Sequence, residues 1–171
     1  MAVPFRPAAA LAAAALLASP LLAVPGPRVR VATIDDLAKP LPLPYDEAAN
    51  ADANVAAAKA RARKSGKKLL IDLGGNWCGD CRVLAGIMHV PEVRAFVARH
   101  YEVVTVDVGR FDKNSQVAAR YGIKERLAGV PAILVVDPKT DRLINAGHIT
   151  ALSDARHMTP QALADWLAQW V

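Results

Sequence analysis

Hydrophobic and polar positions along the chain predict alternating strands and helices. Residues 69–73 form a short apolar run broken only by Asp72, which is typical of a strand buried on both faces. Residues 101–108 and 132–136 are rich in β-branched side chains and predict two further strands. A polar turn follows the third strand, and we expect residues 143–146 to return as its hairpin partner.

Helical patterns lie between these strands. They cover residues 46–64, the stretch from Cys81 to about residue 88, and residues 92–100 and 114–121. A last helix is expected at Thr159-Pro160, where a capping residue precedes the proline favoured at the first helical position. This order predicts an α/β fold with a mixed central sheet of about four strands and helices on both faces.

The first 45 residues are expected to lie outside the folded domain. Residues 1–23 combine one positive charge, an apolar stretch and a small residue near the end, which is typical of a secretory signal peptide. Residues 24–45 contain five prolines and predict an extended lead-in that spaces the domain, residues 46–171, from the membrane or export site. We therefore expect export to a bacterial periplasm. The alternative is a membrane anchor formed by an uncleaved N-terminal segment.

Composition narrows the classes of protein. Of the 171 residues, 53% are hydrophobic and 22% are charged, which excludes both wholesale disorder and a polytopic membrane protein. The net charge of +5 is a mild excess, and the basic residues form no stripe with stacking aromatics. We therefore expect no nucleic-acid partner, and we expect a monomer.

The two cysteines, Cys78 and Cys81, lie where a predicted strand ends and a helix begins. Unpaired N–H groups at a helix N-terminus stabilise a thiolate, so the pKa of Cys78 should be lowered. The spacing brings Cys81 within bridging reach, and Gly79 allows a tight turn between the two. The pattern predicts a redox-active disulfide with no metal and no other cofactor.

A closely spaced cysteine pair has three alternative uses: haem attachment, zinc binding and inert burial. A haem attachment site would need histidine where the chain has Arg82, and is excluded. A structural zinc site would need two further ligands, and the four histidines are scattered along the chain. Zinc and a pair of inert buried cysteines remain as the structural alternatives to redox chemistry.

The motif Trp77-Cys78-Gly79-Asp80-Cys81-Arg82 resembles the active-site signature of the thioredoxin superfamily, and the resemblance covers about residues 50–170. Asp72 resembles the buried aspartate of thioredoxins, and Val130-Pro131 resembles their cis-proline loop. The stretch around residues 90–93 is more similar to exported thioredoxin-like proteins, including the C-terminal domain of the membrane thiol:disulfide interchange protein. The resemblance implies a thioredoxin fold.

The resemblance also implies catalytic roles. Cys78 would attack a partner disulfide, and Cys81 would resolve the mixed disulfide. Burial behind the pair would raise the pKa of Asp72, which could then shuttle the Cys81 proton. The lysine that thioredoxins place near this aspartate has no counterpart in residues 103–107.

Substrate binding is implied at the loop of Val130 and Pro131. A cis peptide bond at Pro131 would let the Val130 backbone pair with an extended segment of a protein or small-molecule disulfide substrate. Trp77 is expected to shield the cysteine pair. Residues 124–129 lengthen the approach to this loop relative to thioredoxin. The reduced state would need an electron donor, for which a membrane thiol:disulfide carrier is the candidate.

Gly79, Asp80 and Arg82 are expected to tune the redox potential. Thioredoxins proper carry proline where this chain has Asp80, and strongly oxidising relatives often carry histidine. An anion beside Cys78 disfavours its thiolate, so Asp80 predicts a reducing pair provided that its charge is not neutralised. Arg82 is close enough in sequence to neutralise part of that charge.

These features predict an exported thiol:disulfide oxidoreductase that acts as a disulfide reductase through Cys78 and Cys81. The enzymatic alternative is a periplasmic disulfide oxidase or isomerase. The non-enzymatic alternative is a thioredoxin-like binding module, or a metallochaperone that holds Cu(I) between the two thiolates.

Overall fold

The computed structural model describes residues 24–171, so the expected signal peptide at residues 1–23 lies outside the described residues. A four-stranded mixed sheet with strand order β2-β1-β3-β4 forms its centre. The strands are β1 (Lys68–Gly74), β2 (Tyr101–Asp107), β3 (Ala132–Asp137) and β4 (Arg142–Leu143). Strand β1 is parallel to β2 and antiparallel to β3, and β4 is antiparallel to β3.

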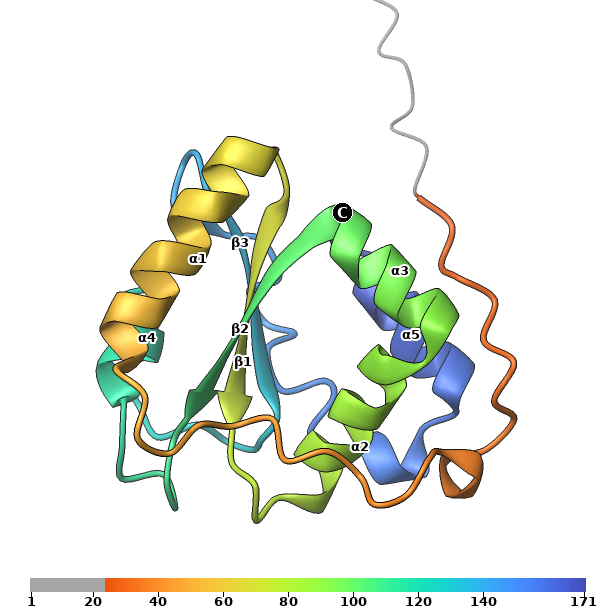
Figure 1. Cartoon of the computed structure of the whole chain (residues 1–171). Coiled ribbons are helices and arrows are strands. Elements are labelled where there is room, and N and C mark those ends of the chain that lie inside the picture. Colours follow the sequence, from red (N-terminus) through yellow and green to blue (C-terminus); the bar gives the residue numbers. More distant parts are fainter. Residues whose placement is uncertain (1–23) are drawn as a thin grey trace, which may run out of the picture.

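Helices cover both faces of this sheet (Figure 1). On one face lie α1 (Ala51–Ser65) and α4 (Ser115–Ala119), and on the other lie α2 (Gly79–His89), α3 (Pro91–His100) and α5 (Pro160–Ala168). The predicted mixed sheet with helices on both faces, which is consistent with a thioredoxin fold, is confirmed.

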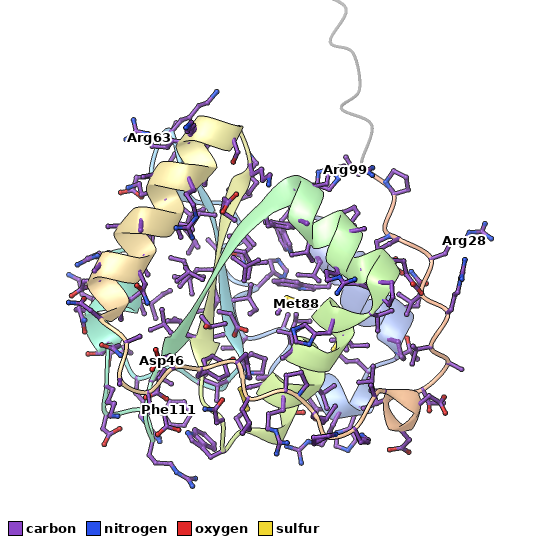
Figure 2. All side chains as sticks on the ribbon, viewed as in Figure 1. Arg28, Asp46, Arg63, Met88, Arg99 and Phe111 are labelled. Carbon is purple, nitrogen blue, oxygen red and sulfur yellow. A yellow bond between two sulfur atoms is a disulfide. The ribbon has the colours of Figure 1, made fainter. Side chains whose placement is uncertain are left out.

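Strand β1 carries the core of both layers. Its side chains alternate between the faces, so Leu70 joins the apolar cluster beneath α2, α3 and α5. Leu69, Ile71 and Leu73 join the cluster beneath α1 and α4. Figure 2 shows side chains filling the space between the sheet and the helices on each side. Burial on both faces explains the nearly continuous apolar run in this strand.

The lead-in, residues 24–45, is extended as predicted apart from the short 3-10 turn η1 (Ile34–Asp36), but it packs against the domain instead of standing away from it. It passes α5 and α2 and then crosses the end of the sheet at which β1 stops (Figure 1). Leu37 is buried in the cluster beneath α2 and α5, and Gln161 of α5 accepts a hydrogen bond from Val29 N at 2.9 Å. The expectation of a spacer is therefore corrected: the folded unit begins before residue 46.

Two element boundaries differ from the prediction by three or more residues, each for a local reason. Helix α1 begins at Ala51 instead of residue 46, because the side chain of Asn50 caps it. Strand β4 ends at Leu143 instead of residue 146, because the buried side chain of Asn145 takes over the pairing with β3. Its Oδ1 accepts from Val135 N at 2.8 Å, and its Nδ2 donates to a β3 carbonyl at 2.7 Å.

The packing of the lead-in can be tested by comparing two of its leucines. Leu37→Ala should lower the free energy of unfolding by about 3 kcal/mol, because it empties a buried site. Leu43 is 63% exposed, so Leu43→Ala should change it by less than about 0.5 kcal/mol. Urea unfolding of the oxidised protein measures both values. Equal, small effects would show that the lead-in does not pack in solution.

Candidate active site

Cys78 and Cys81 form a disulfide at the junction of β1 and α2. Cys78 is the N-cap of α2, and its Sγ accepts a hydrogen bond from Cys81 N at 3.1 Å. Cys78 retains 5% of its exposed surface and Cys81 retains none. A reactant from solvent can therefore reach only Cys78, while the N–H of Cys81 is placed to stabilise negative charge on its sulfur.

The loop that contains Val130 and Pro131 faces this disulfide. The Val130–Pro131 peptide bond is cis, which is the isomer that the resemblance implies. The Val130 carbonyl oxygen lies 3.4 Å from Cys78 Sγ. Cys78 and Val130, which are 52 residues apart in sequence, are thus brought into contact.

Asp72 is fully buried in β1. Its Oδ1 accepts a hydrogen bond from the Tyr45 hydroxyl at 2.8 Å, and its Oδ2 has no partner among the described residues. Burial raises the pKa of Asp72 to about 7, although the hydrogen bond from Tyr45 acts in the opposite direction. The carboxyl group can therefore both take up and release a proton near neutral pH, as a proton shuttle requires.

Tyr45 is a site residue that the sequence analysis missed. Its backbone N–H donates to Asn76 Oδ1 at 3.1 Å, and its carbonyl accepts from Asn76 Nδ2 at 2.8 Å. Asn76 belongs to the turn that leads into Cys78. A side chain at Gly74 would collide with both the Tyr45 hydroxyl and Cys81 Sγ, so the hydroxyl and the sulfur flank the same point of the backbone.

Tyr45 is thus the partner of Asp72 in this chain, which has no counterpart in residues 103–107 of the lysine that thioredoxins place near this aspartate. Thr105, which is paired with Asp72 across the sheet, donates its hydroxyl to the Pro44 carbonyl at 2.9 Å. That bond helps to hold the end of the lead-in against β2. A single tyrosine at the end of a proline-rich segment was the only sequence signal for this contact.

Asp80, in the first turn of α2, is 7% exposed and forms an ion pair with Arg156 of the short 3-10 turn η2 (Ala155–His157). Arg156 Nη2 lies 2.5 Å from Oδ2, and Nε lies 3.0 and 3.1 Å from the two carboxylate oxygens. Burial by itself raises the pKa of Asp80, but the hydrogen bonds and charge of Arg156 outweigh burial and hold the pKa below its usual range.

Arg82 does not neutralise Asp80, which corrects the expectation from the sequence. Its guanidinium donates to the carbonyls of Leu41 and Pro42 at 3.0 and 3.2 Å, and so holds the lead-in against α2. Neutralisation comes from Arg156 instead. The condition under which Asp80 predicted a reducing pair, an unneutralised charge, is therefore not met.

Trp77 lies on the surface beside the pair and is 40% exposed. Its Nε1 donates to the Gly109 carbonyl at 2.7 Å, and its ring centroid lies 5.9 Å from that of Phe111. The Arg110 guanidinium lies over the indole ring at 4.5 Å. These contacts fix the indole ring beside Cys78, whose sulfur is the accessible one of the pair. The tryptophan can therefore contact a partner protein bound there.

Within residues 24–171, no group of three or more histidine, cysteine or acidic side chains is arranged to hold a metal ion. No helix in this range is long and apolar enough to cross a membrane.

The pKa of Asp72 predicts how stability depends on pH. The folded protein retains a proton that the unfolded chain releases, so the oxidised protein should lose stability as pH rises from about 4 to about 7. A rise of about three units corresponds to about 4 kcal/mol. Asp72→Asn should therefore be more stable than wild type above pH 7, by up to about 4 kcal/mol, and the two should converge near pH 4. Urea unfolding across this range measures the difference, and a difference that does not vary with pH would contradict the assignment.

Removal of the Tyr45 hydroxyl tests its contact with Asp72. In Tyr45→Phe the pKa of Asp72 should rise above about 7, because the lost hydrogen bond favours the ionised form. Carbon-13 NMR titration of the carboxyl group in the oxidised protein measures this pKa. Tyr121→Phe is the matched control, because its hydroxyl bonds the exposed Asp141. An unchanged or lowered pKa in Tyr45→Phe would show that the contact is absent.

Comparison with known proteins agrees with this geometry. The family model described as thioredoxin-like matches residues 50–138. "Thioredoxin 1" of Nostoc sp. is 32% identical over 50% of this chain and 73% of its own length. "Thioredoxin 1" of Synechococcus elongatus is 28% identical over 56% of this chain and 83% of its own length.

A solved structure is similar over a longer range. The crystal structure of a disulphide isomerase from Xylella fastidiosa Temecula1 is 37% identical, covers 75% of this chain and 96% of its own, and superposes with a TM-score of 0.69. The matched residues include the strand β1, the cysteine motif and the Val130–Pro131 loop within the family model. With its disulfide at the start of α2, this chain belongs to the thioredoxin-like family and is a thioredoxin-like oxidoreductase.

Proposed function

We propose that this chain is an exported disulfide reductase that exchanges its Cys78–Cys81 dithiol with partner disulfides. The observation that carries the proposal is the placement of Cys78. Its sulfur is the accessible one of the pair, lies 3.4 Å from the Val130 carbonyl and caps α2. The substrate is a disulfide in an extended protein segment or a small molecule that can lie along the Val130 backbone.

The reaction needs two displacements. The Cys78 thiolate attacks one sulfur of the partner disulfide, a mixed disulfide forms, and the other partner sulfur leaves as a thiolate. Asp72 then takes the proton of Cys81, whose thiolate attacks Cys78 Sγ. The Cys78–Cys81 disulfide forms, and the first partner sulfur leaves as a thiolate. Two electrons pass from the pair to the partner.

Two features favour reduction over strong oxidation. A strong oxidant needs a strongly stabilised thiolate. Here the Asp80–Arg156 pair adds no net charge beside Cys78. The curated relatives named above are thioredoxins. An unneutralised Asp80 is therefore not required for this direction of exchange.

The proposed function also requires export of the protein and an electron donor. A signal peptide at residues 1–23 would deliver the protein to an oxidising compartment, where a dithiol does not stay reduced without a supply of electrons. A membrane thiol:disulfide carrier is the class of donor that fits this requirement.

Isomerisation is the second candidate, because the relative from Xylella fastidiosa is titled a disulphide isomerase. An isomerase needs only Cys78, since a thiol of the substrate itself can displace the enzyme from the mixed disulfide. Cys81→Ser should therefore abolish repeated reduction of insulin yet retain reactivation of scrambled ribonuclease if isomerisation is the function. Loss of both activities favours the reductase.

Trapping tests whether Cys78 is the nucleophile. Cys81→Ser should accumulate mixed disulfides that a reducing agent releases, because nothing within the chain can resolve them. Cys78→Ser is the matched control and should trap nothing, because the remaining sulfur is fully buried. Non-reducing gels after incubation with an unfolded, disulfide-bonded protein report the adducts. Absence of adducts with Cys81→Ser would refute the proposed function.

A further inference from the structure

We propose that Arg156 is a positioning residue that sets the redox potential of the Cys78–Cys81 pair by neutralising Asp80. The proposal rests on the proposed thiol:disulfide exchange and adds a residue outside the motif to it. Arg156 touches neither cysteine in this role. It acts through the carboxylate that lies between them in sequence.

The contact is a specific one. The guanidinium and the backbone N–H of Arg156 together make four hydrogen bonds to Asp80, the backbone bond being 2.9 Å long. Such a fork binds a carboxylate in one fixed orientation. The side chain of Asp80 is 10% exposed and that of Arg156 is 55% exposed, so the anion is buried beneath the cation.

The backbone around Arg156 is held close to the cysteine motif at the start of α2. Turn η2 lies between β4 and α5 and packs against α2. Ala155, the neighbour of Arg156, is fully buried in the cluster beneath α2. A side chain at Gly79 would lie 3.3 Å from Arg156 Nη2, so the guanidinium also borders the residue that follows Cys78. This arginine lies outside residues 50–138, which the family model matches.

Removal of Arg156 and removal of Asp80 should shift the reduction potential in opposite directions. Without Arg156, the charge of Asp80, in the first turn of the helix that Cys78 caps, would be unneutralised; it would destabilise the thiolate of the reduced form and make the pair more reducing. Without Asp80, the charge of Arg156 would stabilise the thiolate and make the pair more oxidising. Removal of both should restore a potential close to that of wild type.

Other titratable or charged groups lie near the pair. Asp72 lies on β1, Tyr45 ends the lead-in, and Arg82 lies on α2 with its guanidinium bonded to the lead-in. Arg110 lies over the ring of Trp77, and the charge of Asp154, just before η2, acts on Arg156. Single changes at Arg156 and Asp80 leave these groups in place. Measurements near pH 8 keep Asp80 ionised, although burial opposes its charge once Arg156 is removed.

The test is a double-mutant cycle in the redox equilibrium with glutathione. Arg156→Met should shift the equilibrium constant about tenfold toward the oxidised protein, which is about 30 mV more negative. Asp80→Asn should shift it about tenfold the other way, and the double variant should lie within about threefold of wild type. Arg156→Lys keeps the charge and should stay nearer to wild type than Arg156→Met does.

Two controls separate this effect from damage to the fold. Arg99→Met removes an arginine at the far end of α3 (Figure 2) and should leave the potential unchanged. Urea unfolding of each oxidised variant shows whether the fold persists, and a loss of stability alone cannot produce shifts of opposite sign. The midpoint pH of Cys78 alkylation should be higher in Arg156→Met and lower in Asp80→Asn than in wild type.

The outcomes are distinct. Single variants that shift in the same direction, or not at all, while wild type equilibrates with glutathione, would overturn the role of Arg156. If wild type itself did not exchange with glutathione, the proposed function would fail instead.

Discussion

Burying the Asp72 carboxyl group inside strand β1 removes its hydration, and the surrounding chain must accommodate that cost. A pKa of about 7 corresponds to about 4 kcal/mol at neutral pH, a large share of the 5–15 kcal/mol by which a typical domain is stable. The described structure offers one donor to this group, the Tyr45 hydroxyl. That donor arrives from a segment that crosses the end of β1 and is held there by Asn76 and Arg82.

Asp80, the second acidic residue of the site, is also bound by a partner from a distant segment of the chain. Asp80 is buried at the first turn of α2, and its partner Arg156 comes from the connection between β4 and α5. Both partners, Tyr45 and Arg156, lie outside residues 50–138. The matched part of the fold thus brings together the cysteines and the Val130–Pro131 loop. The flanking segments supply the hydrogen-bond donors for the two carboxyl groups near the cysteine pair.

Local patterns were sufficient to predict the sheet, its helices and the position of the cysteines. Strand β1 is recognisable because both of its faces are buried, and Cys78 is recognisable because a motif coincides with a strand-to-helix junction. Tyr45 and Arg156 were missed because they contact the site from 27 and 76 residues away. Prolines predicted the extended course of the lead-in correctly, but extended backbone is compatible with both a free spacer and a packed strap. Only the tertiary contacts of Leu37 and Tyr45 decide between the two.

The reduction potential of the unmodified protein tests the central claim most directly. It is obtained by equilibrating the chain with glutathione buffers and quantifying the Cys78–Cys81 dithiol. Because Arg156 neutralises Asp80 and no net charge is added beside Cys78, we expect a potential near that of thioredoxin, about −270 mV. A value near −120 mV, typical of strong periplasmic oxidants, would contradict a reductase.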